Sequence, residues 1–245
     1  MIEAFQNLFT PPRHMILLVI AAWLGLTLAE RRSEQHGISK DDLNNITFYG
    51  MIAFIIGGRL TYILQNLEIF SKSPKSIISI NPNLFDVFGA LVVAFIVVFA
   101  YGQKKSLAAW NILDALTPLF AVIAIALGLS HLAAKTAFGI PTNLPWGIEM
   151  WNAIRHPTQL YDAAASSLIL ILVWRFKPKS RPGAVFLIYA ALTAFSQLIL
   201  QAFYAAYIPV FNNIRQAQLI AWLILLACFI LLEIRLKPTS KSKTG

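Results

Sequence analysis

One short stretch of the chain gathers most of the side-chain types that could do chemistry. Eight consecutive residues supply a guanidinium, an imidazole, an amide, a phenol and a carboxylate: Arg155, His156, Pro157, Thr158, Gln159, Leu160, Tyr161 and Asp162. An apolar run from Ala163 to Trp174 follows. If a helix begins here, its free N–H groups and Arg155 could together receive an anionic group, and Pro157 suits the first helical turn. The alternative is a charged cap that anchors a membrane helix at the headgroups.

Further polar residues interrupt the apolar segments elsewhere. Arg59 follows Gly57-Gly58 in an apolar stretch, where a charged side chain is costly unless it faces a polar cavity or a partner. The alternative is that Arg59 reaches the nearby outer membrane surface. His131 could act as a general base or as a hydrogen-bonded packing residue. The topology predicts that several such groups converge on one polar pocket near the outer leaflet: Arg59, His131, Arg155, His156, Gln197, Arg215 and Gln218.

The elements that must position these residues are membrane helices. Of the 245 residues, 58% are hydrophobic and 13% are charged, and the hydrophobic residues form long blocks. A helix needs roughly 20 mostly apolar residues to cross the hydrocarbon core. We therefore predict an all-α polytopic membrane protein with about seven transmembrane helices, in a single integral membrane domain over residues 1–245. The predicted segments are about Met15–Ala29, Ile46–Leu64, Leu84–Tyr101, Ile112–Leu129, Leu160–Phe176, Ala184–Phe203 and Gln216–Ile234.

The net charge of +9 is distributed unevenly between the predicted loops. When the loops are assigned alternately to the two sides, one side receives most of the 20 Lys and Arg residues. That side is predicted to be cytoplasmic, which places the N-terminus outside and the C-terminus in the cytoplasm. The basic excess is therefore a topology signal rather than a sign of nucleic-acid binding. The lone Cys228 cannot form an internal disulfide, and the spacing of the candidate ligands favours neither a metal site nor a cofactor.

Two strings of residues resemble a known family. The segments Gly57 to Leu64 and Arg155 to Asp162 both look like signatures of bacterial prolipoprotein diacylglyceryl transferase. The spacing between them, the seven predicted helices and the outward N-terminus are similar too. The resemblance extends from about residue 14 to residue 230 and includes Trp23 to Arg32, Asp114 to Leu119, Gly139 and Pro145-Trp146-Gly147.

This resemblance implies an activity. The family moves a diacylglyceryl group from phosphatidylglycerol to the cysteine thiol of a preprolipoprotein and releases glycerol phosphate. The implied partners are phosphatidylglycerol or another anionic phospholipid, a preprolipoprotein signal peptide and the lipid bilayer, in a multi-pass protein of the bacterial plasma membrane. The implied catalytic residues are His131 and His156. The implied substrate-binding residues are Arg59, Arg155, Gln159, Tyr161, Gly139 and Arg215.

The chain departs from the family pattern at several polar positions. The family has a His-Gly-Gly string where this chain has Phe88-Gly89-Ala90, and an Arg-Phe string where it has Ala194-Phe195. When the chain is aligned with the family pattern without gaps up to Gly139, Gly128 stands where the family has a phosphate-binding arginine. In the same alignment His131 stands where the family has an asparagine. His14 replaces a tyrosine at the entry to the first helix.

Three functions remain open on these residues. The first is a divergent diacylglyceryl transferase, in which arginines bind the phosphate and His131 or His156 takes the proton from the thiol. The second is a repurposed relative that binds lipid or lipoprotein without transfer, which the replaced polar residues favour. The third is a small-molecule transporter, which the absence of two repeated halves with broken helices disfavours.

Overall fold

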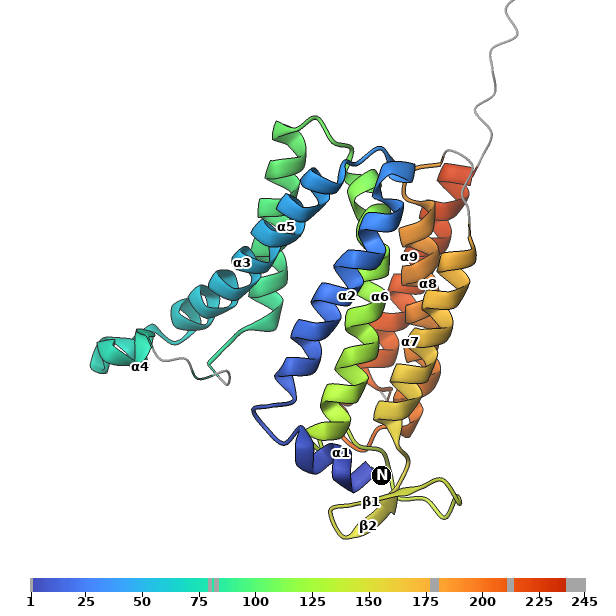
Figure 1. Cartoon of the computed structure of the whole chain (residues 1–245). Helices are drawn as coiled ribbons and strands as arrows, with labels where there is room; N and C mark the ends of the chain where they lie inside the picture. The colour runs from blue at the N-terminus through green and yellow to red at the C-terminus, as the bar shows by residue number, and fades with distance from the viewer. Residues whose placement is uncertain (1, 79–80, 82–83, 177–180, 211–213, 237–245) are drawn as a thin grey trace, which may run out of the picture. The chain divides into compact units, whose positions relative to one another are not determined.

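The computed structural model describes residues 2–78, 81, 84–176, 181–210 and 214–236 (Figure 1). Long helices dominate it, joined by short helices, three 3₁₀ turns and one small β-hairpin. The helices are α1 Ile2–Leu8, α2 Met15–Ser33, α3 Lys40–Gln65, α4 Leu67–Lys72, α5 Val87–Lys104, α6 Ala109–Ala133, α7 Thr158–Arg175, α8 Ala184–Leu200 and α9 Gln216–Leu236. The strands are β1 Ile148–Met150 and β2 Ala153–Arg155. The 3₁₀ turns are Glu34–His36, Pro74–Ile78 and Gln201–Phe203.

Within the described residues, five helices are long and apolar enough to cross a membrane: α3, α5, α6, α8 with its 3₁₀ extension, and α9. Two further predicted spans are helical but more polar. The end of α2 carries Glu30, Arg31 and Arg32, and the start of α7 carries Tyr161 and Asp162. The chain is thus a multi-pass membrane protein, while the count of seven crossings and the orientation of the termini stay predictions.

The chain divides into two compact units, of which residues 33–112 form one. Its main feature is the packing of α3 against α5. A Cβ added to Gly57 would lie 2.9 Å from Val93 Cγ1, so the glycine allows α5 to come close. Both helices have side-chain caps: Ser39 accepts a bond from the Asp42 N–H at 3.0 Å, and Asp86 accepts one from the Gly89 N–H at 2.7 Å. The Gly89 N–H, followed by the Gln65 amide, holds the pKa of Asp86 below its usual value.

The other unit comprises the chain up to Arg32 and from Leu113 onward. In it α2, α6, α7, α8 and α9 run side by side (Figure 1). A Cβ on Gly25 of α2 would lie 2.9 Å from the Leu119 backbone of α6, and Ile169, Val173 and Val185 form a core between α7 and α8. The bundle is therefore held by close backbone approach at glycines and by apolar side chains between neighbouring helices.

Two side chains fix the helix ends opposite the β-hairpin of this unit. Buried Asp114 accepts bonds from the N–H groups of Gly183 at 2.6 Å and Phe186 at 2.8 Å, so it caps the start of α8. Asp114 itself belongs to α6, so its side chain links the start of α8 to that helix. Arg32 stacks 4.2 Å above the Trp174 ring and donates to carbonyls at the end of α7, where a cation complements the helix dipole.

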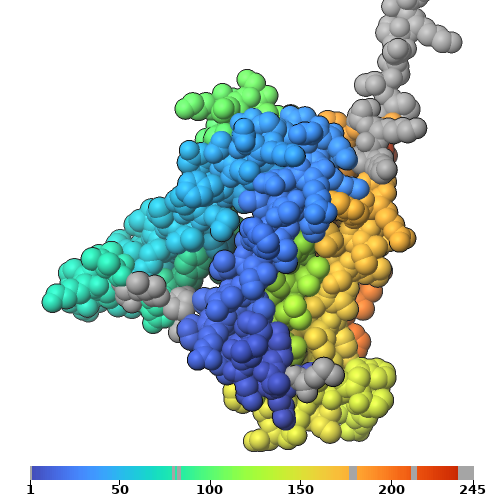
Figure 2. Space-filling model, in the orientation of Figure 1, coloured from blue at the N-terminus to red at the C-terminus, as the bar shows by residue number. Residues whose placement is uncertain are grey.

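The segment between α6 and α7 contains the β-hairpin, which the all-α prediction did not include. Ile148 pairs with Arg155 and Met150 with Ala153, and the turn residues Trp151 and Asn152 both have positive φ, 55° and 59°. The Gly139 N–H donates to the His156 carbonyl at 3.2 Å, which draws the segment onto the start of α7. Gln6 of α1 donates to the Leu132 carbonyl at 3.1 Å, so the N-terminal residues and the hairpin segment lie at the same end of this unit (Figure 2).

Candidate functional site

A hydrogen-bonded carboxylate lies where α7 meets α8. Asp162 accepts a bond from Gln197 Nε2 of α8 at 2.9 Å and another from the Tyr204 hydroxyl. Gln201 Nε2 in turn donates to Gln197 Oε1 at 3.0 Å. Burial, together with the bond to Asp162, raises the pKa of Tyr204, so the phenol keeps its proton and acts as the donor. Two donors thus orient one carboxylate among membrane helices, and Gln201 holds one of them, Gln197, in place.

His131 of α6 is electrostatically coupled to this carboxylate. The two helices cross closely at Gly128, where an added Cβ would meet the Gln159 carbonyl oxygen at 2.7 Å and the Ala163 nitrogen at 3.0 Å. His131 follows Gly128 by almost one helical turn, and its ring interacts electrostatically with Asp162 and with His14. A neutral imidazole next to a carboxylate can accept a proton, because the carboxylate stabilises the imidazolium that forms.

His156 and Tyr161 belong to a neighbouring aromatic cluster. The Tyr161 hydroxyl accepts a bond from Trp146 Nε1 at 2.8 Å and lies 3.2 Å from His156 Nδ1. The His156 ring also packs against Phe203, with the centroids 5.0 Å apart. The tyrosine therefore orients the imidazole, and both side chains are half-buried.

Three of the predicted substrate-binding residues hold the segment 136–156 in place. Arg155 donates from Nε to the Met150 carbonyl at 3.0 Å and from Nη1 to the Gly139 carbonyl at 3.3 Å. Gln159 is fully buried and donates to the Thr136 carbonyl at 2.7 Å. Gly139 leaves no space for a side chain, since a Cβ would lie 2.6 Å from the His156 Cβ. In this structure these residues shape the wall next to His156.

The other two predicted arginines are also bonded to backbone carbonyls. Arg215 Nη1 donates to the carbonyls of Gln201 and Tyr204, each at 2.6 Å. Arg59, in the unit of residues 33–112, donates to the carbonyls of Leu84 at 2.8 Å and Ser76 at 2.5 Å. The other unit contains the remaining predicted catalytic and substrate-binding residues, namely His131, Gly139, Arg155, His156, Gln159, Tyr161 and Arg215. The convergence of Arg59 with them stays a prediction.

The replaced family positions do not provide another phosphate-binding group. Gly128 is closed by α7, Ala194 is 5% exposed, and Phe88 is 79% exposed and apolar. Asp162, Tyr204 and His14 were not among the predicted site residues. Asp162 stood inside the signature string, whereas no pattern around Tyr204 or His14 pointed to the carboxylate.

Comparisons with known proteins identify the family of the chain. A family described as prolipoprotein diacylglyceryl transferase matches residues 12–234. The chain belongs to the prolipoprotein diacylglyceryl transferase family. Relatives named phosphatidylglycerol–prolipoprotein diacylglyceryl transferase share 31% identity in Finegoldia magna, over 68% of this chain and 67% of the relative, and 28% in Clostridium tetani, over 76% and 77%. The Thermotoga maritima relative of the same name is 26% identical over 87% of this chain and 77% of its own. The family match thus spans both units.

Proposed function

We propose that this protein is a phosphatidylglycerol–prolipoprotein diacylglyceryl transferase. The observation that carries the proposal is the family match over residues 12–234, which includes both signature strings. In the reaction, the cysteine sulfur of a preprolipoprotein attacks the glycerol carbon of the diacylglyceryl group. A C–S bond forms, the C–O bond to the phosphate breaks, and glycerol phosphate leaves. The thiol proton must pass to a base, because the thiolate is the nucleophile.

His131 is the base that the geometry supports best. Asp162 interacts with it electrostatically, is itself held by Gln197 and Tyr204, and would stabilise the imidazolium. His156 is the second candidate base, and its neighbour Tyr161 orients it. Arg155, Arg215 and Arg59 would supply positive charge to the lipid phosphate, while Gln159 and Gly139 keep the wall of the site in position.

The proposal also covers the membrane topology and the cellular location of the protein. We propose seven crossings in the bacterial plasma membrane, as a single integral domain over residues 1–245, with the hairpin segment and the N-terminus outside. The outward side suits an acceptor that is exported with its signal peptide, and the anionic phospholipid reaches the site from within the bilayer.

A second function is favoured by a specific observation. At Gly128 the crossing of α6 and α7 leaves no room for a side chain, so the family's arginine cannot be accommodated there without moving α7. The three remaining arginines each bond to backbone carbonyls. A protein with this site could bind an anionic lipid or a lipoprotein without transferring the diacylglyceryl group.

The deciding experiment is transfer of labelled diacylglyceryl from phosphatidylglycerol to a peptide with a lipobox cysteine, using purified protein in detergent. We expect transfer that requires the thiol, a reduction of about 10²-fold or more in His131→Ala, and loss in Arg155→Ala with membrane insertion intact. No transfer beside an active relative, with lipid binding preserved, would establish the non-transferring function instead. Full activity in both variants would remove the site assignment.

A further inference from the structure

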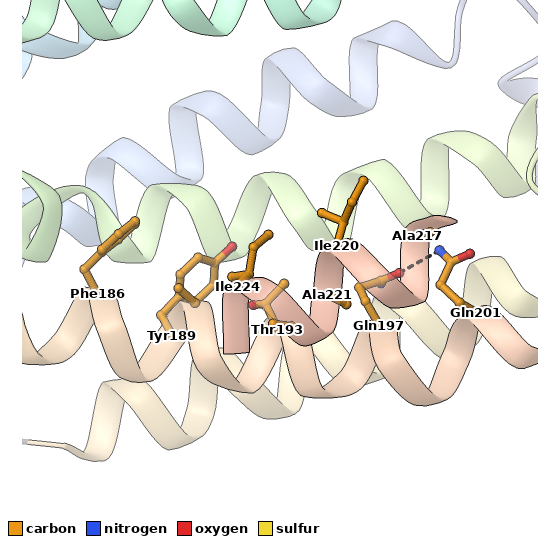
Figure 3. A pocket seen from close by; sticks show the side chains of 11 residues that line it. Phe186, Tyr189, Thr193, Gln197, Gln201, Ala217, Ile220, Ala221 and Ile224 are labelled. Carbon is orange, nitrogen blue, oxygen red and sulfur yellow. Dashed lines mark hydrogen bonds between the residues drawn. The ribbon is translucent and has the colours of Figure 1, made fainter. Parts of the chain in front are cut away.

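A groove runs between α8 and α9 on the side of α8 that carries Gln197 (Figure 3). Its volume is about 410 Å³. Small residues from both helices open it, namely Ala190 and Ala194 of α8 and Ala217 and Ala221 of α9. Ala194 stands at the position where the family pattern has an arginine, so the short side chain contributes space. The side chains of Ile220 and Ile224 are 48% and 45% exposed, so the groove opens to the surroundings of this unit.

The groove has the dimensions of one extended chain. It follows α8 from Phe186 to Gln201, and these 15 helical steps at 1.5 Å span about 22 Å. Both walls are helices apolar enough to cross a membrane, so hydrocarbon surrounds the opening. These dimensions fit a single extended acyl chain.

One end of the groove is polar and lies next to a positive charge. Gln197 and Gln201 line this end, and Gln197 also bonds to Asp162, so the groove adjoins the carboxylate and His131. Arg215 donates to the Gln201 carbonyl at 2.6 Å, which fixes its charge beside the same end. No charged side chain lines the rest of the groove among the residues that the structure describes. Along the groove toward Arg215, the lining is thus first apolar, then carries the amides of Gln197 and Gln201, and ends beside the cationic Arg215.

We propose that this groove holds one acyl chain of an anionic phospholipid, with the ester near Gln201 and the phosphate toward Arg215. The order of groups in such a lipid, hydrocarbon, ester and phosphate, matches the order of groups along the groove. An ester carbonyl accepts hydrogen bonds from an amide, and a phosphate pairs with a guanidinium. The assignment of this lipid as the diacylglyceryl donor rests on the proposed function. Seated in this way, the glycerol part lies between Gln201 and Arg215, and Gln201 is linked through Gln197 to Asp162.

Photolabelling in lipid nanodiscs tests the proposal. The probe is phosphatidylglycerol with a diazirine near the end of one acyl chain, in a background of phosphatidylcholine, and adducts are mapped by mass spectrometry. We expect adducts on groove residues such as Tyr189 and Ile224. Ala217→Phe should fill the groove and lower this labelling by about tenfold, the change that about 1.4 kcal/mol produces. Ala227→Phe adds the same ring at an exposed position of α9 outside the groove and should leave it unchanged.

The remaining parts of the experiment distinguish lipid bound in this groove from lipid in general contact with the protein surface. The same diazirine chain on phosphatidylcholine should label about tenfold less. Equal labelling by the two lipids, or by wild type and Ala217→Phe, would show annular lipid only and overturn the proposal. Ala190→Phe repeats the block from α8 if Ala217→Phe does not fold. Transfer is assayed on the same samples: specific labelling without transfer would support the groove and refute the proposed function, and transfer without groove labelling would overturn the groove alone.

Discussion

At the scale of single residues, the site contains a half-buried hydrogen-bond network around a carboxylate. Tyr204 and Gln197 both donate to Asp162, so the carboxylate is compensated although it lies among membrane helices. Arg215 is linked to the same network, because it holds the carbonyl of Tyr204. A guanidinium has five N–H groups, so bonds to carbonyls fix its position and leave its charge in place. The site therefore combines a candidate base, His131, with the positive charge of Arg215, whose position is fixed by its bonds to backbone carbonyls.

The first residue-scale prediction concerns Asp162→Asn. The substitution removes the negative charge and turns an NH₂ group toward one of the two donors, Gln197 or Tyr204. We expect kcat for transfer to fall by about 10²-fold while KM for phosphatidylglycerol stays nearly unchanged, because the carboxylate acts through His131 and not on the lipid. Asp162→Glu should restore part of kcat. A rise in KM with unchanged kcat would show instead that Asp162 belongs to the lipid-binding wall.

The second residue-scale prediction concerns Gly128→Ala. The added methyl group would press on the backbone of Gln159 and Ala163, and overpacking of this kind costs about 1–3 kcal/mol. Alanine favours the helical state over glycine by about 1 kcal/mol, which is less than the larger values of this overpacking cost. We expect a lower unfolding temperature in detergent. The matched control is Gly50→Ala, whose methyl group meets only Val98 Cγ2, at 3.0 Å, and which should be neutral or stabilising.

The residues show what a sequence can and cannot predict about such a site. The signature string located Asp162 and His156, because their types and order are specific. The partners of Asp162 depend on how α7 and α8 are rotated against each other, which no local pattern specifies. Gly128 was identified as a missing arginine, but its structural role as the contact between α6 and α7 follows only from the helix crossing.

At the scale of elements, hydrophobic length predicted the helices and turn chemistry failed to predict the hairpin. All seven expected segments are helical, and α3 and α6 extend beyond the predicted bounds because polar residues continue both helices. The strands β1 and β2 have three residues each, too short for an alternating pattern. Their turn uses Trp151 and Asn152 instead of the Asn-Gly pair that usually marks such a turn.

The element-scale prediction concerns the cap of α8. Asp114→Ala leaves the N–H groups of Gly183 and Phe186 without their acceptor in a buried position. Each unsatisfied buried group costs about 1–3 kcal/mol, so we expect a clear loss of thermal stability. Asp114→Asn keeps one acceptor and should lie between wild type and the alanine variant. Hydrogen exchange at the start of α8 should rise in the same order; unchanged exchange there would contradict the capping role.

At the scale of the whole molecule, the charge pattern and the apolar lengths support different counts of crossings. In the part of the chain that the structure describes, five helices satisfy length and composition, whereas the alternation of basic loops requires α2 and α7 to cross as well. The charged residues that make α2 and α7 polar include one that bonds to a helix end and one that belongs to the candidate site. Arg32 closes the end of α7, and Asp162 forms the centre of the site. A helix that carries its polar groups at its ends can still cross, because they reach the interface or a partner.

Cysteine accessibility separates seven crossings from five. In a Cys228→Ala background, single cysteines are placed at exposed positions on both sides of α2, at Glu3 and Gln35, and on both sides of α7, at Glu149 and Arg181. If α2 and α7 cross, a membrane-impermeant maleimide labels Glu3→Cys and Glu149→Cys in intact cells, and labels Gln35→Cys and Arg181→Cys only after permeabilisation. If either helix stays on one side, the two members of its pair react alike. If both members of the α7 pair react only after permeabilisation, the hairpin lies on the cytoplasmic side, and the proposed outward site would have to be abandoned.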